Sequence, residues 1–211
     1  MHRIVLATLA ALCASAALAQ EPPDVMVRKS VDEVLAAVKA DKDLQSGNQQ
    51  KIMALAEEKV LPHFDFERMT RLAMGRAWQQ ATPEQRQALV KEFRMLIVRT
   101  YSTSIGQYRN QTVEVKPLKA GAADKDVVVR SEVKQSGGPP IPIDYSMEKA
   151  GNDWKVYDVV VDGVSLVTTY RGSFSDQIQK GGVDGLVKTL QERNRSGDAS
   201  RPTPVKGEAK K

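Results

Sequence analysis

Residues 141–162 read IPIDYSMEKAGNDWKVYDVVVD, and this stretch decides the fold of the chain. Over residues 141–147 each apolar side chain is followed by a proline, a charged residue or a serine, which is the period of two of a β-strand. Residues 154–162 form a second apolar run, and Gly151 and Asn152 favour a tight turn between the two runs. The stretch therefore predicts two neighbouring antiparallel strands.

The residues before this hairpin continue the strand pattern. Val113 and Val115 alternate with charged residues, and a valine-rich run over residues 127–133 places Val128 on the face opposite its neighbours. The glycines and prolines of residues 137–140 provide the turn into the next strand. Four strands joined by short connections predict an antiparallel meander.

The last of these strands is apolar on both faces. Strict alternation assigns one face to Trp154, Val156 and Val160 and the other to Tyr157, Val159 and Val161. Both faces are therefore predicted to be covered by helices. Helices that stand off the sheet would leave an apolar cleft, but a filled core has the same periodicity, so the pattern alone does not separate the two.

Helical spacing dominates the chain before the strands. Apolar residues recur every three or four positions over residues 27–39, 48–62 and 65–75. The clearest boundary is Thr82-Pro83-Glu84-Gln85, where a threonine N-cap, a proline at the first helical position and a glutamine at the capping-box position open a helix. This helix is expected to run for about 26 residues, or roughly 39 Å, and to form one wall of the domain.

Helical spacing returns at Val164 and continues to Gly181, followed by a last helix over residues 183–190. The chain is therefore predicted to be α+β, with a four-stranded antiparallel sheet packed with about six helices, and the pattern leaves open whether these surround an apolar ligand cavity. Residues 20–194 are expected to form a single domain. Residues 195–211, rich in Ser, Gly, Pro, Lys and Glu, are expected to be a disordered tail.

Residues 1–19 have the layout of a cleavable signal peptide. A basic start at Arg3 precedes an unbroken apolar or small run over residues 4–18, which closes with Ala17-Leu18-Ala19. The run is shorter than the roughly 20 residues of a spanning helix, so an uncleaved membrane anchor is the less favoured alternative. The single cysteine, Cys13, lies in this segment, and the mature chain is expected to lack thiols and to reside in the periplasm.

Few residues of the mature chain suit catalysis or metal binding. Its one histidine, His63, cannot assemble a nitrogen or sulfur zinc site, and neither Gly-Gly pair has the spacing of a phosphate-binding loop. The formal net charge is +5, but basic residues are interspersed with acids, which argues against nucleic-acid binding. Asp158 and Asp162 are a conceivable acid and base pair, although acids at strand ends more often accept hydrogen bonds from loops.

Two long blocks of the sequence resemble one known family. The first is HFDFERMTRLAMGR at residues 63–76, followed by ATPEQR at residues 81–86. The second is WKVYDV at residues 154–159, followed by GVSLV at residues 163–167. These blocks resemble the MlaC family, also called toluene-tolerance proteins, over roughly residues 31–190. Gln79 departs from the family pattern, in which a basic residue is common, and the chain beyond Arg193 resembles nothing familiar.

The resemblance implies a function without catalysis. The MlaC family supplies the periplasmic phospholipid-binding component of the Mla lipid-asymmetry system. It implies a monomeric carrier that holds a phospholipid as cargo, with no metal and no other cofactor. The implied partners are an outer-membrane lipoprotein and porin complex and an inner-membrane ABC transporter with its periplasmic lipid-binding subunit.

The acyl tails are expected to lie between the sheet and the helices, against apolar and tyrosine side chains of both layers. The predicted tail contacts are Met69, Leu72, Leu96, Tyr101, Val129, Tyr145, Met147, Val159, Val161, Val164, Val167, Tyr170 and Phe174. Arg94, Arg99 and Arg171 are candidates for the pocket mouth, the headgroup or partner docking. For each of these residues, ordinary core packing or a solvated surface is the alternative.

Two other classes of protein stay open at this point. A pocket enzyme on an α+β cone scaffold would need an acid and a base inside the cavity, for example Asp158 with Tyr145. A ligand-free periplasmic adaptor would have a closed core instead of a cavity. Bound phospholipid would separate the carrier from both.

Overall fold

The structure is a computed structural model that describes residues 21–106, 111–119, 121, 124–135, 137–198, 200 and 202. The predicted signal peptide, including Cys13, and residues 203–211 of the predicted tail lie outside the described residues. The helices of the described part are α1 (Pro23–Ala40), α2 (Lys42–Gln45), α3 (Gln49–Lys59), α4 (Phe66–Met74), α5 (Pro83–Gly106) and α6 (Leu166–Ser196), with 3-10 turns η1 (Leu61–His63) and η2 (Gly75–Gln80). The strands are β1 (Thr112–Val115), β2 (Asp126–Lys134), β3 (Ile141–Ala150), β4 (Asp153–Val161) and β5 (Val164–Ser165).

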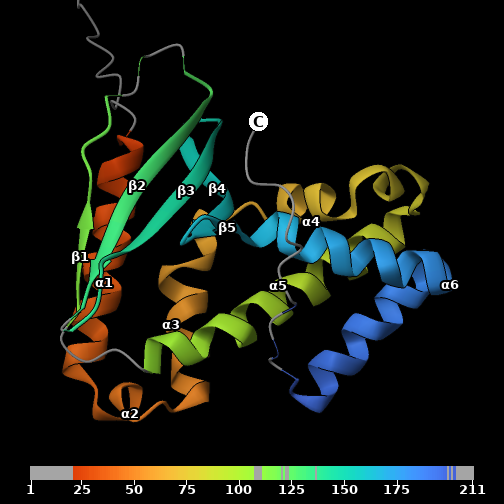
Figure 1. Ribbon diagram of the computed structural model, residues 1–211, viewed down its shortest axis with the longest axis horizontal. Helices are drawn as coiled ribbons and strands as arrows, with labels where there is room; N and C mark the ends of the chain where they lie inside the picture. The colour runs from red at the N-terminus through yellow and green to blue at the C-terminus, as the bar shows by residue number, and fades with distance from the viewer. Residues whose placement is uncertain are drawn as a thin grey trace, which may run out of the picture.

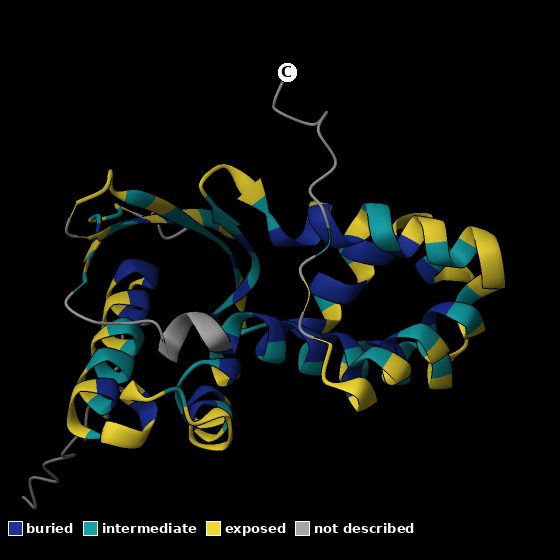
Figure 2. Ribbon diagram, turned by 60° about the horizontal axis from the view of Figure 1, so that its bottom comes forward, coloured by how far each residue is buried: buried dark blue, intermediate teal, exposed yellow. Residues whose placement is uncertain are grey.

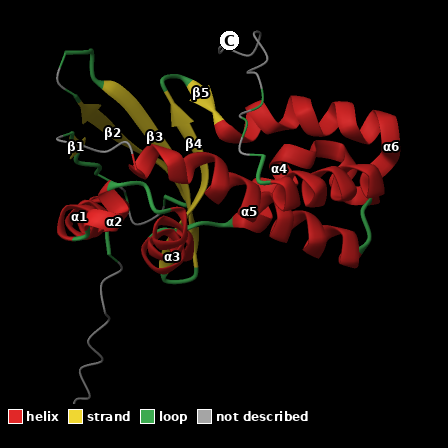
Figure 3. Cartoon of the chain, turned by 90° about the horizontal axis from the view of Figure 1, so that it is seen from below, coloured by secondary structure: helices red, strands yellow, loops and turns green. Residues whose placement is uncertain are grey.

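These elements form two lobes joined by one long helix (Figure 1). The sheet, with α1 packed along it and α2 and α3 beside α1, makes one lobe, while α4, η2 and α6 make the other. The helix α5 reaches from the helical lobe to the sheet lobe, as the view from below also shows (Figure 3). The α+β class predicted from the sequence is confirmed.

Side-chain caps set the helix boundaries that the sequence predicts. The Thr82 backbone N–H donates to Oε1 of Gln85 at 2.9 Å, and the Gln85 N–H donates to Oγ1 of Thr82 at 3.2 Å. This reciprocal pair is the predicted capping box at the start of α5. Asn48 and Asp65 likewise accept backbone N–H groups at the starts of α3 and α4. The boundaries follow from local chemistry, because each capping residue satisfies a donor that the helix itself leaves unpaired.

Within the described residues, the sheet has five antiparallel strands in the order β1-β2-β3-β4-β5, one more than predicted. The extra strand begins at Val164, which pairs with Val161 rather than opening a helix. Asp162 and Gly163 between them have φ values of 51° and 78°. Positive φ at both central residues is the geometry of a two-residue hairpin turn, for which Asp-Gly is a favoured pair. The helix α6 therefore begins only at Leu166, after an N-cap at Ser165.

A β-bulge in β4 makes the predicted assignment of its two faces wrong. Met147 of β3 pairs with Val156, but Ser146 pairs with Asp158, so Tyr157 has no partner in the ladder. The extra residue puts Val159 on the same face as Val156. Val161 follows on that face and Val160 on the other. One face of β4 is therefore apolar and carries the core, and the opposite face is more polar than alternation predicts. Figure 2, coloured by burial, shows buried residues in both lobes.

A kink divides α6 where the sequence places two consecutive glycines. Gly182 has φ 66° and ψ −168°, outside the helical region, and the two halves of the helix diverge there. The second half ends at Ser196, where Gly197 is in the left-handed conformation. The two helices predicted on either side of these glycines are thus present, and together they wrap one end of α5. None of the described helices is long and apolar enough to cross a membrane.

Replacing Gly182 by alanine should lower the free energy of unfolding by about 1 to 3 kcal/mol, because its backbone region is open almost only to glycine. Gly181→Ala is a matched control, since a methyl group at either glycine meets no atom within 4 Å and only Gly182 has a positive φ. The control should be neutral or stabilising by up to about 1 kcal/mol. Urea denaturation of both variants measures the difference, and equal effects would contradict the role of the kink.

Candidate functional site

The buried apolar side chains of the described residues form three clusters: a helical cluster and a sheet cluster, which meet, and a smaller one among α1, α2 and α3. The helical cluster is built from α4, α5 and α6 around Phe93, Tyr170 and Phe174, whose rings pack edge to face with centroids 4.9 to 5.9 Å apart. The sheet cluster lies on the inner face of the sheet and includes side chains of α1. Phe64 and Tyr101 pack against both clusters. These two aromatic residues bridge the boundary between the clusters. We call this boundary the seam.

All of the predicted tail contacts except Val164 belong to one of the two clusters or pack against them. Those in the helical cluster are Met69, Leu96, Val167, Tyr170 and Phe174, with Leu72 packed against it. Those in the sheet cluster are Val129, Met147 and Val159, with Tyr145 and Val161 packed against it. Tyr101 contacts both. Val164 lies apart from them, because it sits in β5 with 40% of its surface exposed.

The polar groups on the inner face of the sheet are hydrogen-bonded to one another. The Ser131 hydroxyl donates to the Ile143 carbonyl at 3.1 Å, and Ser131 is almost fully buried. Tyr145 is hydrogen-bonded to Ser131, and burial raises the pKa of the Tyr145 phenol above its ordinary value. Because these polar atoms are already hydrogen-bonded, the inner face of the sheet presents an apolar surface to the seam. Such a surface suits a hydrocarbon chain better than a polar reacting group.

Asp158 holds the start of α6 in place. Its Oδ2 accepts the Ser165 hydroxyl at 2.6 Å, and its Oδ1 accepts the Val167 N–H at 3.1 Å. Asp158 pairs with Ser146 and Tyr145 pairs with Val159, so the side chains of Asp158 and Tyr145 lie on opposite faces of the sheet. Asp162 is exposed in the hairpin turn. The two acid and base pairs considered from the sequence do not meet in one pocket.

Asp158→Asn should fold and should leave phospholipid content unchanged, since the amide oxygen still accepts a hydrogen bond. Burial is the largest influence on Asp158 and raises its pKa, while the hydrogen bond from Ser165 opposes this shift. A raised pKa means that the native state binds the proton more tightly, so this contribution to stability is present at low pH and is lost as pH rises through the folded-state pKa. Urea unfolding from pH 7 to pH 4 should therefore favour wild type increasingly over the variant as pH falls. A constant difference would contradict this.

The three predicted arginines lie apart from one another. Arg94 forms an ion pair with Glu57 of α3 and lies over the Phe66 ring. Arg171 donates from Nε to the Leu72 carbonyl at 3.0 Å, which ties α6 to α4. Arg99 lies beside the C-terminal end of α6 (a methyl group at Gly197 would be 3.4 Å from its Nη1), where a cation is favourable to the helix dipole.

Sequence reasoning gave no role to Arg68, which attaches α4 to the outer face of the sheet. Its guanidinium carbon lies 3.5 Å from the centroid of the Tyr157 ring, and its nitrogens pair with Glu148 and, at 3.1 Å, with Asp126. Burial raises the pKa of Glu148, and the Arg68 charge acts against that shift. These partners come from β4, β3 and β2, so the contact forms only in the folded chain and has no local sequence signal.

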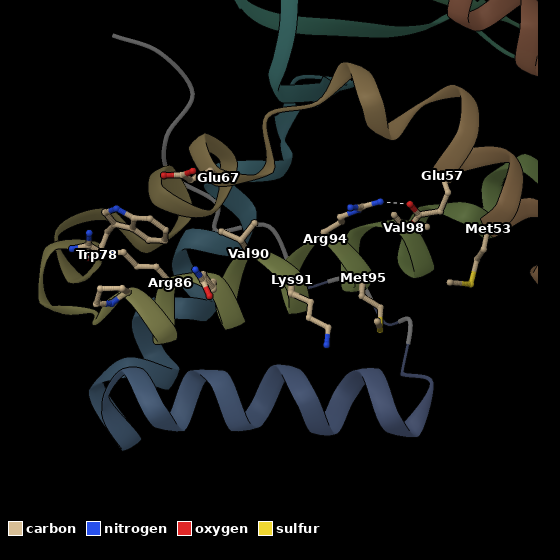
Figure 4. Close-up of a pocket in the computed structure, with 12 residues that line it drawn as sticks. Met53, Glu57, Glu67, Trp78, Arg86, Val90, Lys91, Arg94, Met95 and Val98 are labelled. Carbon is tan, nitrogen blue, oxygen red and sulfur yellow. Dashed lines mark hydrogen bonds and ion pairs between the residues drawn. The ribbon is translucent and has the colours of Figure 1, made fainter. Parts of the chain in front are cut away.

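A hollow lies along α5, and Trp78 and Val98 of its lining belong to the edge of the helical cluster. It has a volume of about 700 Å³ and is open to solvent. Figure 4 shows its lining side chains, from Trp78 at one end to Met53 at the other. The lining residues are Met53, Glu57, Glu67, Trp78, Pro83, Arg86, Gln87, Val90, Lys91, Arg94, Met95 and Val98. We call this feature the α5 groove; Arg94 is the one predicted site residue in it.

The described residues hold no cluster of three or more His, Cys, Asp or Glu side chains suited to a metal ion. His63 lies in η1, half-buried, where burial and then the Lys155 charge lower its pKa. The Lys155 ammonium donates to the carbonyl of the preceding Pro62 at 2.7 Å. His63 is therefore part of the connection between α3 and α4.

The fold is shared with a protein that binds a lipid. A solved structure from Ralstonia solanacearum, described as a phospholipid-binding protein in complex with a phospholipid, matches with a TM-score of 0.76 and 48% sequence identity. The match covers 85% of this chain and 98% of that one. The two chains therefore have the same two-lobed architecture.

The sequence profile of the MlaC protein family matches residues 28–192, and the chain belongs to this family. Toluene tolerance protein ttg2D of Pseudomonas putida is 28% identical over 213 residues, which cover 98% of each chain. The intermembrane phospholipid transport system binding protein MlaC of Haemophilus influenzae is 24% identical over 179 residues, 83% of this chain and 84% of that protein. The resemblance seen in the two sequence blocks is confirmed.

Proposed function

We propose that this chain is a periplasmic carrier that buries the acyl tails of a phospholipid in the seam between the helical and sheet clusters. The phospholipid held by the Ralstonia solanacearum protein carries the proposal, because that protein shares this fold at 48% identity. The name of the Haemophilus influenzae relative, a binding protein of an intermembrane phospholipid transport system, supports the same assignment.

The side chains along the seam suit hydrocarbon. Both walls are apolar, and the polar atoms of Ser131 and Tyr145 are hydrogen-bonded to each other within the sheet cluster. Exposing two acyl chains of about 16 carbons to water costs on the order of 25 kcal/mol, at roughly 0.8 kcal/mol per methylene. A phospholipid therefore crosses water slowly unless a soluble protein covers its tails, and the headgroup can stay hydrated.

The proposal extends to export and to partners. Residues 1–19 would direct the chain across the inner membrane and be removed. The carrier would act as a monomer that exchanges lipid with an outer-membrane lipoprotein and porin complex and with an inner-membrane ABC transporter through its periplasmic lipid-binding subunit. Membership of the MlaC family supports these partners. Arg94, Arg99 and Arg171 are the residues proposed to contact these partners or the headgroup.

A carrier without catalysis is favoured over a pocket enzyme. An enzyme would need an acid and a base facing one cavity, and Asp158 and Tyr145 lie on opposite faces of the sheet. Asp158 is instead engaged with the start of α6.

Native mass spectrometry of the protein purified from the periplasm tests the proposal. We expect roughly one phospholipid per chain, recoverable by organic extraction, and rebinding of phospholipid by the extracted protein. A protein that carries no phospholipid and does not rebind it would overturn the carrier and leave the ligand-free adaptor.

A further inference from the structure

We propose that the α5 groove is a second ligand site, separate from the seam, that takes one long-chain fatty acid with its carboxylate at the Trp78 end. None of the predicted tail contacts lines this groove. Leu89, Phe93 and Leu96 are fully buried on the opposite side of α5, in the helical cluster. A ligand in the groove and a phospholipid in the seam would thus be held on different surfaces of the same helix.

The floor of the groove is a strip of apolar side chains that the fold leaves partly uncovered. Met53, Val90 and Met95 are half-buried, and Val98 is buried. Methionine side chains adapt to irregular hydrocarbon, so two of them beside one groove favour a flexible apolar ligand. The volume of about 700 Å³ is within the range of pockets for small molecules.

The strip is long enough for one acyl chain. The lining residues of α5 run from position 83 to position 98, and at 1.5 Å per residue this is about 22 Å. A bilayer interior is roughly 30 Å thick and contains two leaflets, so one extended acyl chain spans about 15 Å. The single strip has room for one such chain along α5, which favours a fatty acid over a diacyl phospholipid.

The cations along the groove favour an anionic headgroup near Trp78. Arg86 lies over the Trp78 ring and donates from Nε to the Trp78 carbonyl at 3.1 Å. This carbonyl is a neutral acceptor, so the contact does not neutralise the positive charge of Arg86. Lys91 is exposed and forms no ion pair among the described residues. Arg94 is already paired with Glu57, and Glu67 is the other acid of the lining. A carboxylate beside Arg86 and Lys91 would gain charge-assisted hydrogen bonds.

The first test is a titration of the phospholipid-loaded protein with palmitate, followed by native mass spectrometry. We expect one added palmitate per chain with the phospholipid retained. Val90→Glu, which puts a carboxylate into the strip, should weaken palmitate binding about tenfold or more. Val128→Glu is the matched control, because Val128 is exposed on the outer face of the sheet, and it should bind like wild type. Absence of added palmitate, or equal binding by the two variants, would overturn the site.

The second test measures the contribution of the cations of the groove separately from that of its apolar strip. Arg86→Gln should weaken palmitate binding about tenfold, because a hydrogen bond to a charged group is removed. Lys91→Gln should have a smaller effect in the same direction and does not disturb the Trp78 contact. Arg71→Gln, at an exposed position of α4 outside the groove, should have none. Equal affinity of all three variants would overturn the assignment of the headgroup.

The same spectra distinguish this inference from the carrier proposal. Wild-type protein that carries no phospholipid before palmitate is added counts against the carrier proposal. Wild-type protein that carries phospholipid but adds no palmitate counts against the groove proposal alone. Replacement of the phospholipid by palmitate, with Val90→Glu behaving as wild type, would mean that palmitate enters the seam and would overturn the second site.

Discussion

Val159→Trp should reduce the phospholipid recovered from roughly one per chain to nearly none while the protein stays folded. Val159 pairs with Tyr145 on the inner face of the sheet and lies in the sheet cluster. An indole at this position would occupy the space that acyl tails need. Native mass spectrometry and organic extraction measure the occupancy, and Val167→Trp on the helical side of the seam should act in the same way.

Val128→Trp is the control for this prediction, because Val128 is on the opposite face of the same sheet and 39% exposed. It should keep its phospholipid. If the interior is solidly packed instead, Val159→Trp should lower the free energy of unfolding by about 1 to 3 kcal/mol without any change in bound lipid. That outcome would count against a lipid-filled seam.

Phe93→Ala should have the largest effect on stability, about 3 to 5 kcal/mol. Phe93 is fully buried, and its ring centroid lies 4.9 Å from that of Tyr170 and 5.0 Å from that of Phe174. Removal of the ring leaves a cavity where α5 meets α6, and the edge-to-face contacts are lost with it. Urea denaturation gives the change in the free energy of unfolding.

Val25→Ala provides the comparison, since Val25 is 42% exposed on α1 and its truncation should change stability by at most about 0.5 kcal/mol. A loss below about 1 kcal/mol for Phe93→Ala would mean that the aromatic cluster does not hold α5 and α6 together.

The sequence was sufficient for two features that depend on local chemistry. The start of α5 follows from the reciprocal bonding of Thr82 and Gln85, and the kink of α6 follows from its consecutive glycines. The extra strand was missed because the helical spacing after Val164 outweighed the turn signal of Asp162 and Gly163. That turn signal was present in the sequence.

Features that depend on tertiary contacts were not predictable in this way. The bulge at Tyr157 is defined by the register against β3, so alternation within β4 gave the wrong faces for Val159, Val160 and Val161. The α5 groove combines side chains of α3, α4, η2 and α5, and no single segment carries its pattern. Most of the predicted tail contacts are buried, because each belongs to an amphipathic element whose apolar face must be covered, but contact with lipid stays a prediction.

Because Tyr157 has no partner in the ladder, the loss or gain of one residue at this position during evolution would affect the two faces of the sheet differently. Deletion of that residue would leave Val156, Asp158 and Val159 in regular alternation, so the surface proposed to hold lipid would keep its orientation. The same deletion would remove the aromatic platform beneath Arg68. During evolution, a one-residue insertion or deletion at this position could therefore strengthen or weaken the attachment of one lobe to the other. The face of the sheet proposed to contact lipid would not change.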